Sequence, residues 1–269
     1  MKNRSSLASQ GIIVPSPTRY RKLLRDTVLQ LKGSAASEQT QAMILDQIMD
    51  EPHAERLILS WDSFLSFPTW AVTDAIYAFA GERSLAFTQI FPDIEAEFHL
   101  AIRNPATFLP GLQEKIVTKG QPEFLSTIDP TGLQWSSTIS QIRSYNPNVE
   151  LTVWCDEDTP LIWPEVLQAV AGPAEGTVLS DTDELLSRLM TADGLARMNA
   201  YSAAHPPVSI AQRRRIVTAF LEKFAIPDML EMEFEVPGWS EELVADLTRR
   251  YLEDVERIKR IPGVRFLSA

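Results

Sequence analysis

Short, unbroken apolar runs alternate along this chain with longer segments in which apolar residues recur every three or four positions. The runs Leu57 to Trp61 (LILSW), Glu97 to Ile102 (EFHLAI) and Leu151 to Cys155 (LTVWC) predict strands that are buried on both faces. Weaker runs at Gly11 to Val14 and Val264 to Leu267 predict two more strands. Because strands that alternate with helices are typical of a parallel sheet with crossover helices, we predict an α/β fold.

The helical segments lie between these strands and, almost without interruption, after Gly172. We therefore predict a single domain over residues 1–269, in which residues 1–172 form the sheet and residues 173–269 form a mainly helical part packed against one end. Apolar spacing predicts one helix through Tyr20 and Leu31 and another through Met43 and Ile48. The other helices are predicted at Pro160 to Val170, Glu184 to Met190, Ala192 to Ala204, Ser209 to Phe224 and Glu241 to Ile261.

Composition excludes several classes of protein and partner. With 45% hydrophobic and 23% charged residues, the chain can bury a full core and is not expected to be disordered. A net charge of −11 repels a polyphosphate backbone, so we expect no nucleic-acid partner. One cysteine and three scattered histidines offer neither an internal disulfide nor zinc-ligand spacing. No apolar run reaches the roughly 18 residues of a membrane span, and residues 1–15 lack a signal-peptide core, so we expect a cytoplasmic protein without a membrane partner.

The segment Phe98 to Pro105 (FHLAIRNP) carries the strongest candidate for binding. Here an apolar strand ends in Arg103 and then in a turn. Ligands of open α/β sheets bind beyond the carboxyl ends of the strands, where an arginine can hold a phosphate with two parallel hydrogen bonds. The alternative is that Arg103 pairs with a carboxylate at the surface.

A strand that ends in Arg-Asn-Pro resembles the sulfotransferase element that holds the 3′-phosphate of 3′-phosphoadenosine 5′-phosphosulfate. In order and spacing, further segments resemble bacterial sulfotransferase-like proteins, and together they cover nearly the whole chain. These segments are GIIVPSPTRYRKLL, RLILSWDSFL, LAIRNPATFLP, LTVWCDEDTPLIWPEVL and PGVRFL. The resemblance implies a three-layer parallel sheet of the P-loop sulfotransferase type and sulfuryl transfer from the phosphosulfate co-substrate to a hydroxyl or amine acceptor, either a small molecule or a glycan.

Two departures from the family pattern bear on activity. The family opens with a strand and a Lys-Thr-Gly-Thr type loop that cradles the 5′-phosphosulfate, and residues 1–10 do not match it. We expect these residues to be the last turns of the helix that follows such a loop, so that the chain is N-terminally truncated relative to the family. The family also places a serine about eight residues after the arginine, where this chain has Gly111, although Thr107 and Thr118 are nearby hydroxyls.

The missing strand lies inside the sheet of this family, so its loss predicts two neighbouring strands with unpaired edges beside an apolar gap. We expect upstream sequence, another segment or a partner to fill that gap. A continuous sheet without a substituting strand would contradict this expectation.

Asp62, after the first strong strand, is the candidate catalytic residue. The resemblance implies a carboxylate near the acceptor, which would act as a general base or orient the acceptor hydroxyl. The alternative is helix capping by Asp62 or Ser63. Asp156, Glu157 and Asp158 could hold Mg²⁺ or Mn²⁺ for glycosyl transfer, but capping of the next helix is the simpler interpretation, and we predict no metal.

Two other features are interpreted structurally. His99 is expected to be a satisfied core or half-buried residue. Arg213 to Arg215 are expected on a solvated helix face, because three successive residues cannot share one side of a helix.

Two functions stay open. One is a sulfotransferase-like enzyme in which Arg103 holds the 3′-phosphate and Asp62 lies near the acceptor. The other is a non-catalytic relative that acts as an interaction or structural protein, with a protein partner. An anion-binding cluster around Arg103 would favour the enzyme, and an apolar patch at the missing strand would favour the interaction protein.

Overall fold

A computed structural model describes residues 2–230 and 236–269 of the chain. Its strands form two small sheets, in which every neighbouring pair is parallel. The first sheet joins β1 (Ile12–Ile13) to β2 (Arg56–Leu57), and the second has the order β3 (Glu97–Ile102), β4 (Glu150–Cys155), β5 (Val264–Leu267). The prediction of an α/β fold with parallel strands is confirmed at this level.

The five strands lie where the sequence predicts them, but β2 is shorter than expected. It ends at Leu57, whereas the apolar run continues to Trp61. The Tyr20 hydroxyl donates to the Ser60 carbonyl at 2.7 Å and accepts from the Ser60 amide at 2.8 Å. Because a buried side chain satisfies both backbone groups of Ser60, the run leaves the strand early.

Seven α-helices of the described chain precede Gly172, and one or two of them lie between each strand and the next. The predicted helices near both ends of this part are present, whereas three in the middle were not predicted from the sequence. The seven are α1 (Arg4–Ala8), α2 (Pro17–Leu31), α3 (Glu38–Ile48), α4 (Ala80–Thr88), α5 (Pro105–Val117), α6 (Trp135–Tyr145) and α7 (Thr159–Ala171). The three that the sequence analysis missed are α4, α5 and α6.

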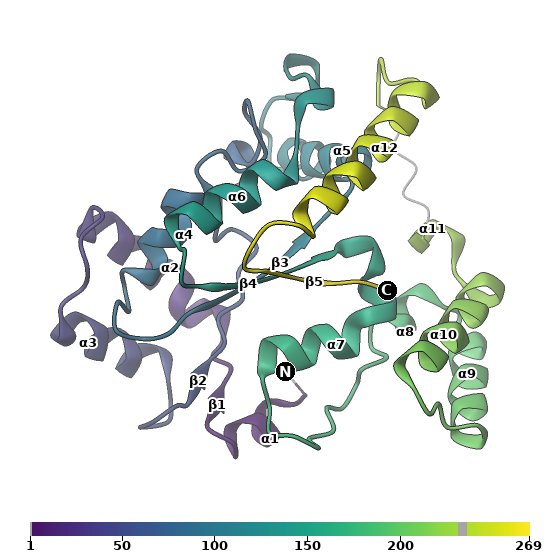
Figure 1. Cartoon of the computed structure of the whole chain (residues 1–269), viewed down its shortest axis with the longest axis horizontal. Coiled ribbons are helices and arrows are strands. Elements are labelled where there is room, and N and C mark those ends of the chain that lie inside the picture. The colour runs from purple at the N-terminus through teal and green to yellow at the C-terminus, as the bar shows by residue number, and fades with distance from the viewer. Residues whose placement is uncertain (1, 231–235) are drawn as a thin grey trace.

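The strands form the middle layer between two layers of helices (Figure 1). On one face α7 spans both sheets, because Ile162 and Val166 pack with Trp154 of β4 while Leu167 and Ala171 pack toward the sheet of β1 and β2. On the other face, one end of α4 packs in the core cluster around β3 and β4. The other end of α4 packs with α2 and α3. The two sheets are therefore held in one layer by helices on both sides.

The region after Gly172 divides into two parts. Four helices gather at one end of the molecule, as Figure 1 shows at the right, and three of them close over a small core of Leu186, Met190, Met198 and Val217. The chain then returns to the main layer, where the last helix packs against α5 and α6 and β5 pairs with β4. The helices are α8 (Leu186–Leu189), α9 (Ala192–Ala204), α10 (Ile210–Phe224), α11 (Pro227–Leu230) and α12 (Glu241–Ile258).

Candidate functional site

The turn after β3 is bound tightly into the fold at the carboxyl ends of β3 and β4. The Arg103 carbonyl accepts from the Trp135 indole at 2.7 Å, and the Asn104 amide donates to the Glu157 carboxylate at 2.6 Å. The Asn104 side chain caps α5 at the Ala106 amide (3.0 Å) and donates to the Thr248 hydroxyl of α12 at 2.9 Å. The Arg103 carbonyl and the Asn104 amide and side chain are thus engaged in structural contacts.

The Arg103 side chain is half-buried and donates from Nε to the Thr107 hydroxyl at 3.2 Å. Of the two candidate threonines, Thr107 is therefore the one whose hydroxyl contacts Arg103. Thr118 instead donates to the Glu114 carbonyl at 2.7 Å near the other end of α5. An arginine and a hydroxyl do lie together at the end of β3, one turn into α5.

Asp62 forms an ion pair with Lys115, at 3.0 Å between Oδ2 and Nζ, and accepts from the Ser63 hydroxyl at 3.1 Å. These hydrogen bonds, that of Lys115 above all, hold the pKa of Asp62 below its usual range. A lowered pKa makes this carboxylate a weaker base. Neither Asp62 nor Ser63 begins a helix, so the capping interpretation of both residues was wrong.

Asp62 and Arg103 are anchored at opposite ends of α5, through Lys115 and Thr107 respectively. Eight residues separate these two anchors, which corresponds to about 12 Å along the helix axis. The two predicted site residues therefore do not contact each other.

The acidic cluster after β4 is used by the fold. Asp156 accepts from the Thr159 hydroxyl at 3.3 Å, and Glu157 accepts from Tyr251 at 3.1 Å besides the Asn104 amide. Asp158 precedes α7 without a side-chain capping bond, so the predicted cap is not formed. Within residues 2–230 and 236–269, no three His, Cys, Asp or Glu side chains gather as metal ligands.

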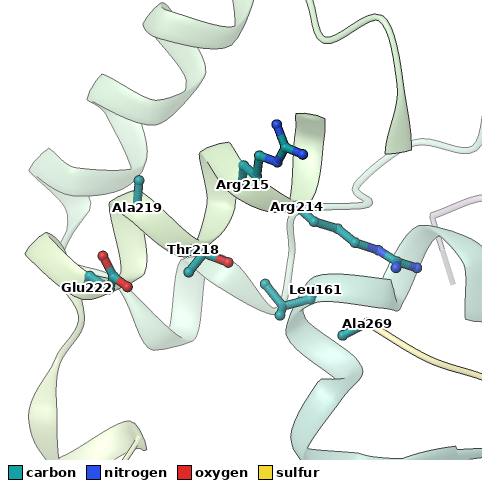
Figure 2. A pocket seen from close by; sticks show the side chains of 7 residues that line it. All are labelled: Leu161, Arg214, Arg215, Thr218, Ala219, Glu222 and Ala269. Atoms are coloured by element: carbon teal, nitrogen blue, oxygen red, sulfur yellow. The ribbon is translucent and has the colours of Figure 1, made fainter. Parts of the chain in front are cut away.

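Arg214 and Arg215 of α10 line a cavity of about 330 Å³ between α10 and the start of α7 (Figure 2). Arg213 pairs with Asp183 at 2.6 Å and Arg214 with Glu165 at 2.8 Å. Figure 2 shows Arg214 and Arg215 pointing in different directions, as expected for successive helical positions. Since Arg213 and Arg214 are ion-paired, the expectation of a simple solvated face was wrong for these two residues.

The most unusual feature is the break in the strand layer between β2 and β3. No backbone hydrogen bond joins these two strands in the part of the chain that the structure describes. Their starts are instead bridged by Arg56 and Glu97, whose guanidinium and carboxylate form two hydrogen bonds of 2.7 and 2.8 Å. Gly172, at the end of α7, leaves room for this arginine, because a Cβ there would lie 3.0 Å from the guanidinium.

The strands on either side of the break are less buried than the strand in the middle of the second sheet. Residues 151–154 of β4 are buried, whereas residues 98–101 of β3, and residues 56–59 in β2 and just after it, are only half-buried. The residues on these two stretches are mostly apolar, among them Leu57, Leu59, Phe98 and Leu100. These side chains pack against the two neighbouring core clusters, Phe98 and Leu100 against one and Leu57 and Leu59 against the other.

His99 of β3 lies beside this break and is half-buried, as predicted, but its ring is not satisfied by hydrogen bonds. Within the described residues, neither buried ring nitrogen forms a hydrogen bond, although Nε2 lies 3.4 Å from a Glu97 carboxylate oxygen. Burial lowers the pKa of His99 below its usual range, and this effect exceeds the opposing influence of Glu97. The sequence signal was a histidine within an apolar strand, which does not reveal whether its nitrogens find partners.

Comparison of the sequence with protein-family models, with curated proteins and with solved structures gave no significant match. In the described ranges, every helix is too short or too polar to cross a membrane.

Proposed function

We propose that this chain is a sulfotransferase-like protein that serves in protein interaction, and that it accepts one extended strand of a partner polypeptide between β2 and β3. The observation that carries this proposal is the break in the strand layer. Among the described residues no backbone hydrogen bond joins β2 to β3 across it, while helices on both faces keep the two sheets in place.

Backbone chemistry specifies what the break can bind. Every unpaired strand edge offers a row of N–H and C=O groups, and another strand satisfies that row most completely. Paired strands lie about 4.8 Å apart, whereas long side chains such as Arg56 and Glu97 can bridge strands that are too far apart to share backbone hydrogen bonds. The side chains on both rims are mainly apolar, so the added segment should be apolar as well.

Peptide binding tests this proposal. The probe is an eight-residue peptide of alternating valine and threonine, and the control is the same peptide with alternate amides N-methylated, which removes the donors that a ladder needs. The unmodified peptide should raise the Tm and slow amide exchange in residues 56–60 and 97–102, and the methylated peptide should do neither. Equal effects of the two peptides, or no effect of either, would contradict strand addition.

Sulfuryl transfer is the second candidate, and the pairing of Arg103 with the Thr107 hydroxyl favours it. An arginine and a hydroxyl beyond the carboxyl end of a strand are suited to a phosphate. Titration with 3′,5′-adenosine diphosphate, alongside Arg103→Ala, separates the two functions. Binding that depends on Arg103 would support a nucleotide site in this chain. Absence of binding to either protein would contradict sulfuryl transfer and favour the interaction role.

A further inference from the structure

A second concave site lies away from the break, between α2, α4 and the loop that follows β2. It encloses about 240 Å³. Its walls are aromatic and aliphatic, with Trp61 and Phe67 from the loop, Phe87 from α4 and Leu29 from α2. We refer to this site as the aromatic pocket.

The walls of the aromatic pocket are fixed by ring packing. Trp61 meets Phe64 edge to face at 5.5 Å and Phe67 at 6.2 Å between ring centroids, and Phe64 meets Phe87 at 5.0 Å. Phe67 and Leu29 nevertheless remain 38% and 67% exposed, which is unusual for apolar side chains beside a preformed hollow. The pocket therefore offers uncovered apolar surface on a rigid support.

The rim of the aromatic pocket carries charged side chains of both signs. Arg25 and Arg83 line it together with a single carboxylate, Glu82. Arg25 pairs with Asp26 at 2.9 Å, and Glu82 accepts from the Tyr145 hydroxyl at 3.3 Å. Arg83 is exposed, and its guanidinium forms no ion pair or hydrogen bond with any residue in the described part of the chain.

Size and charge together define the ligand. A volume of 240 Å³ is below the roughly 300–1,000 Å³ typical of sites for larger ligands, so the pocket can hold one ring system or one branched aliphatic group. One uncompensated arginine at the rim matches a single anionic group. An aromatic body between Trp61 and Phe87 would place a carboxylate within reach of Arg83.

We propose that the aromatic pocket binds a small molecule made of a flat apolar body and one carboxylate. This inference goes beyond the interaction role and does not rest on it, because the pocket shares no wall with β3.

Indole-3-propionate is the probe, and the readout is the ¹⁵N-resolved shift of the Trp61 indole N–H. The ligand should bind with a dissociation constant on the order of 1 mM or tighter. Arg83→Gln should weaken binding about fivefold, which is the effect of losing one exposed charged hydrogen bond. Leu29→Glu, at an exposed position that tolerates a polar residue, should weaken it further by placing a second carboxylate at the rim.

Two controls make the result specific. Arg215→Gln, beside the other cavity, should leave the affinity unchanged, and tryptamine, which carries an amine instead of the carboxylate, should bind more weakly than the acid. Absence of a saturable shift, or equal affinity of the Arg83→Gln variant, would overturn the proposal. Binding of the dipeptide acetyl-Trp-Glu-amide without binding of the free acid would also overturn it, in favour of a peptide-docking site.

Discussion

The strand β4 and the segments beside the break, β3 and the run from β2 to Leu59, are all rich in apolar residues but have different surroundings. β4 pairs with β3 on one edge and β5 on the other, and its residues 151–154 are buried. β2 and β3 each pair on one edge, and their corresponding stretches are half-buried. The comparison shows that an apolar run predicts a strand here, whereas its burial depends on whether both edges find a neighbour.

Truncation of leucines on the two kinds of strand should produce the largest difference. Leu151 of β4 is 1% exposed, so Leu151→Ala should lower the free energy of unfolding by about 3 kcal/mol through lost burial and a cavity. Leu100 of β3 is half-buried, and Leu100→Ala should cost about 1 kcal/mol. Urea unfolding at pH 7 measures both variants.

Similar losses of unfolding free energy in the two variants would contradict this difference, since they would mean that β3 is as well buried in solution as β4. In the presence of a strand peptide that binds the break, the cost of Leu100→Ala should rise toward that of Leu151→Ala.

The Arg56–Glu97 bridge should contribute an intermediate amount. The pair is about one third exposed at both side chains and is bidentate, and the Arg56 guanidinium holds the pKa of Glu97 below its usual range. A double-mutant cycle with Arg56→Met and Glu97→Gln at pH 7, where Glu97 is charged, should give a coupling energy of about 1 kcal/mol. A coupling indistinguishable from zero would show that the bridge does not hold the two sheets together.

His99 should make stability fall as the pH drops below neutrality. Its pKa is lowered in the folded protein, so below the usual value of about 6.5 the unfolded chain takes up a proton that the folded chain does not. Stability attributable to His99 is therefore complete above pH 6.5 and decreases as the pH falls toward the folded pKa. Glu97, Arg56 and Arg265 are the charged groups that act on this ring.

Urea unfolding at pH 7.5 and 5.5 checks this dependence. His99→Gln stays neutral over this range, so the variant should lose less stability than the parent between the two values. An unchanged pH dependence in the variant would contradict a buried, unpartnered histidine.

The smallest effect is expected at the Asp62–Lys115 pair, which joins exposed side chains. Asp62 and Lys115 are 60% and 47% exposed, so Lys115→Met should change the free energy of unfolding by no more than about 0.5 kcal/mol. The same variant raises the pKa of Asp62 toward its ordinary value, which a carboxylate titration followed by NMR would detect. If Lys115→Met lowered the free energy of unfolding as much as the Arg56–Glu97 pair contributes, the greater exposure of the Asp62–Lys115 pair would not explain the difference expected between the two pairs.

The sequence predicted the strands well because their signals are local. Glu97–Ile102 and Val264–Leu267 were predicted with their observed bounds, and α9 was predicted from Ala192 to Ala204 as observed. The helices α4, α5 and α6 were missed. Prolines within Pro105–Val117 and mixed polar and apolar positions elsewhere obscure their period.

The site was less predictable because it depends on contacts between distant residues. The sequence of its segment predicts that Arg103 lies at the end of a strand. The sequence does not predict that Arg103 contacts Thr107, or that Trp135 and Glu157 hydrogen-bond to the turn. The resemblance alone led us to expect a gap between two neighbouring strands, and it did not indicate which two. The aromatic pocket joins α2, α4 and a loop, and no spacing in the sequence indicates that these segments meet.

Amide hydrogen exchange in the free protein tests the unpaired edge most directly. In a parallel ladder alternate amides of a strand face each neighbour, so the amides of β3 that face away from β4 should lack a partner. Those amides of residues 97–102 should exchange at least about a hundredfold faster than the amides of residues 151–154. Uniform protection of all β3 amides at the level of β4 would contradict the break and with it the proposed strand-accepting site.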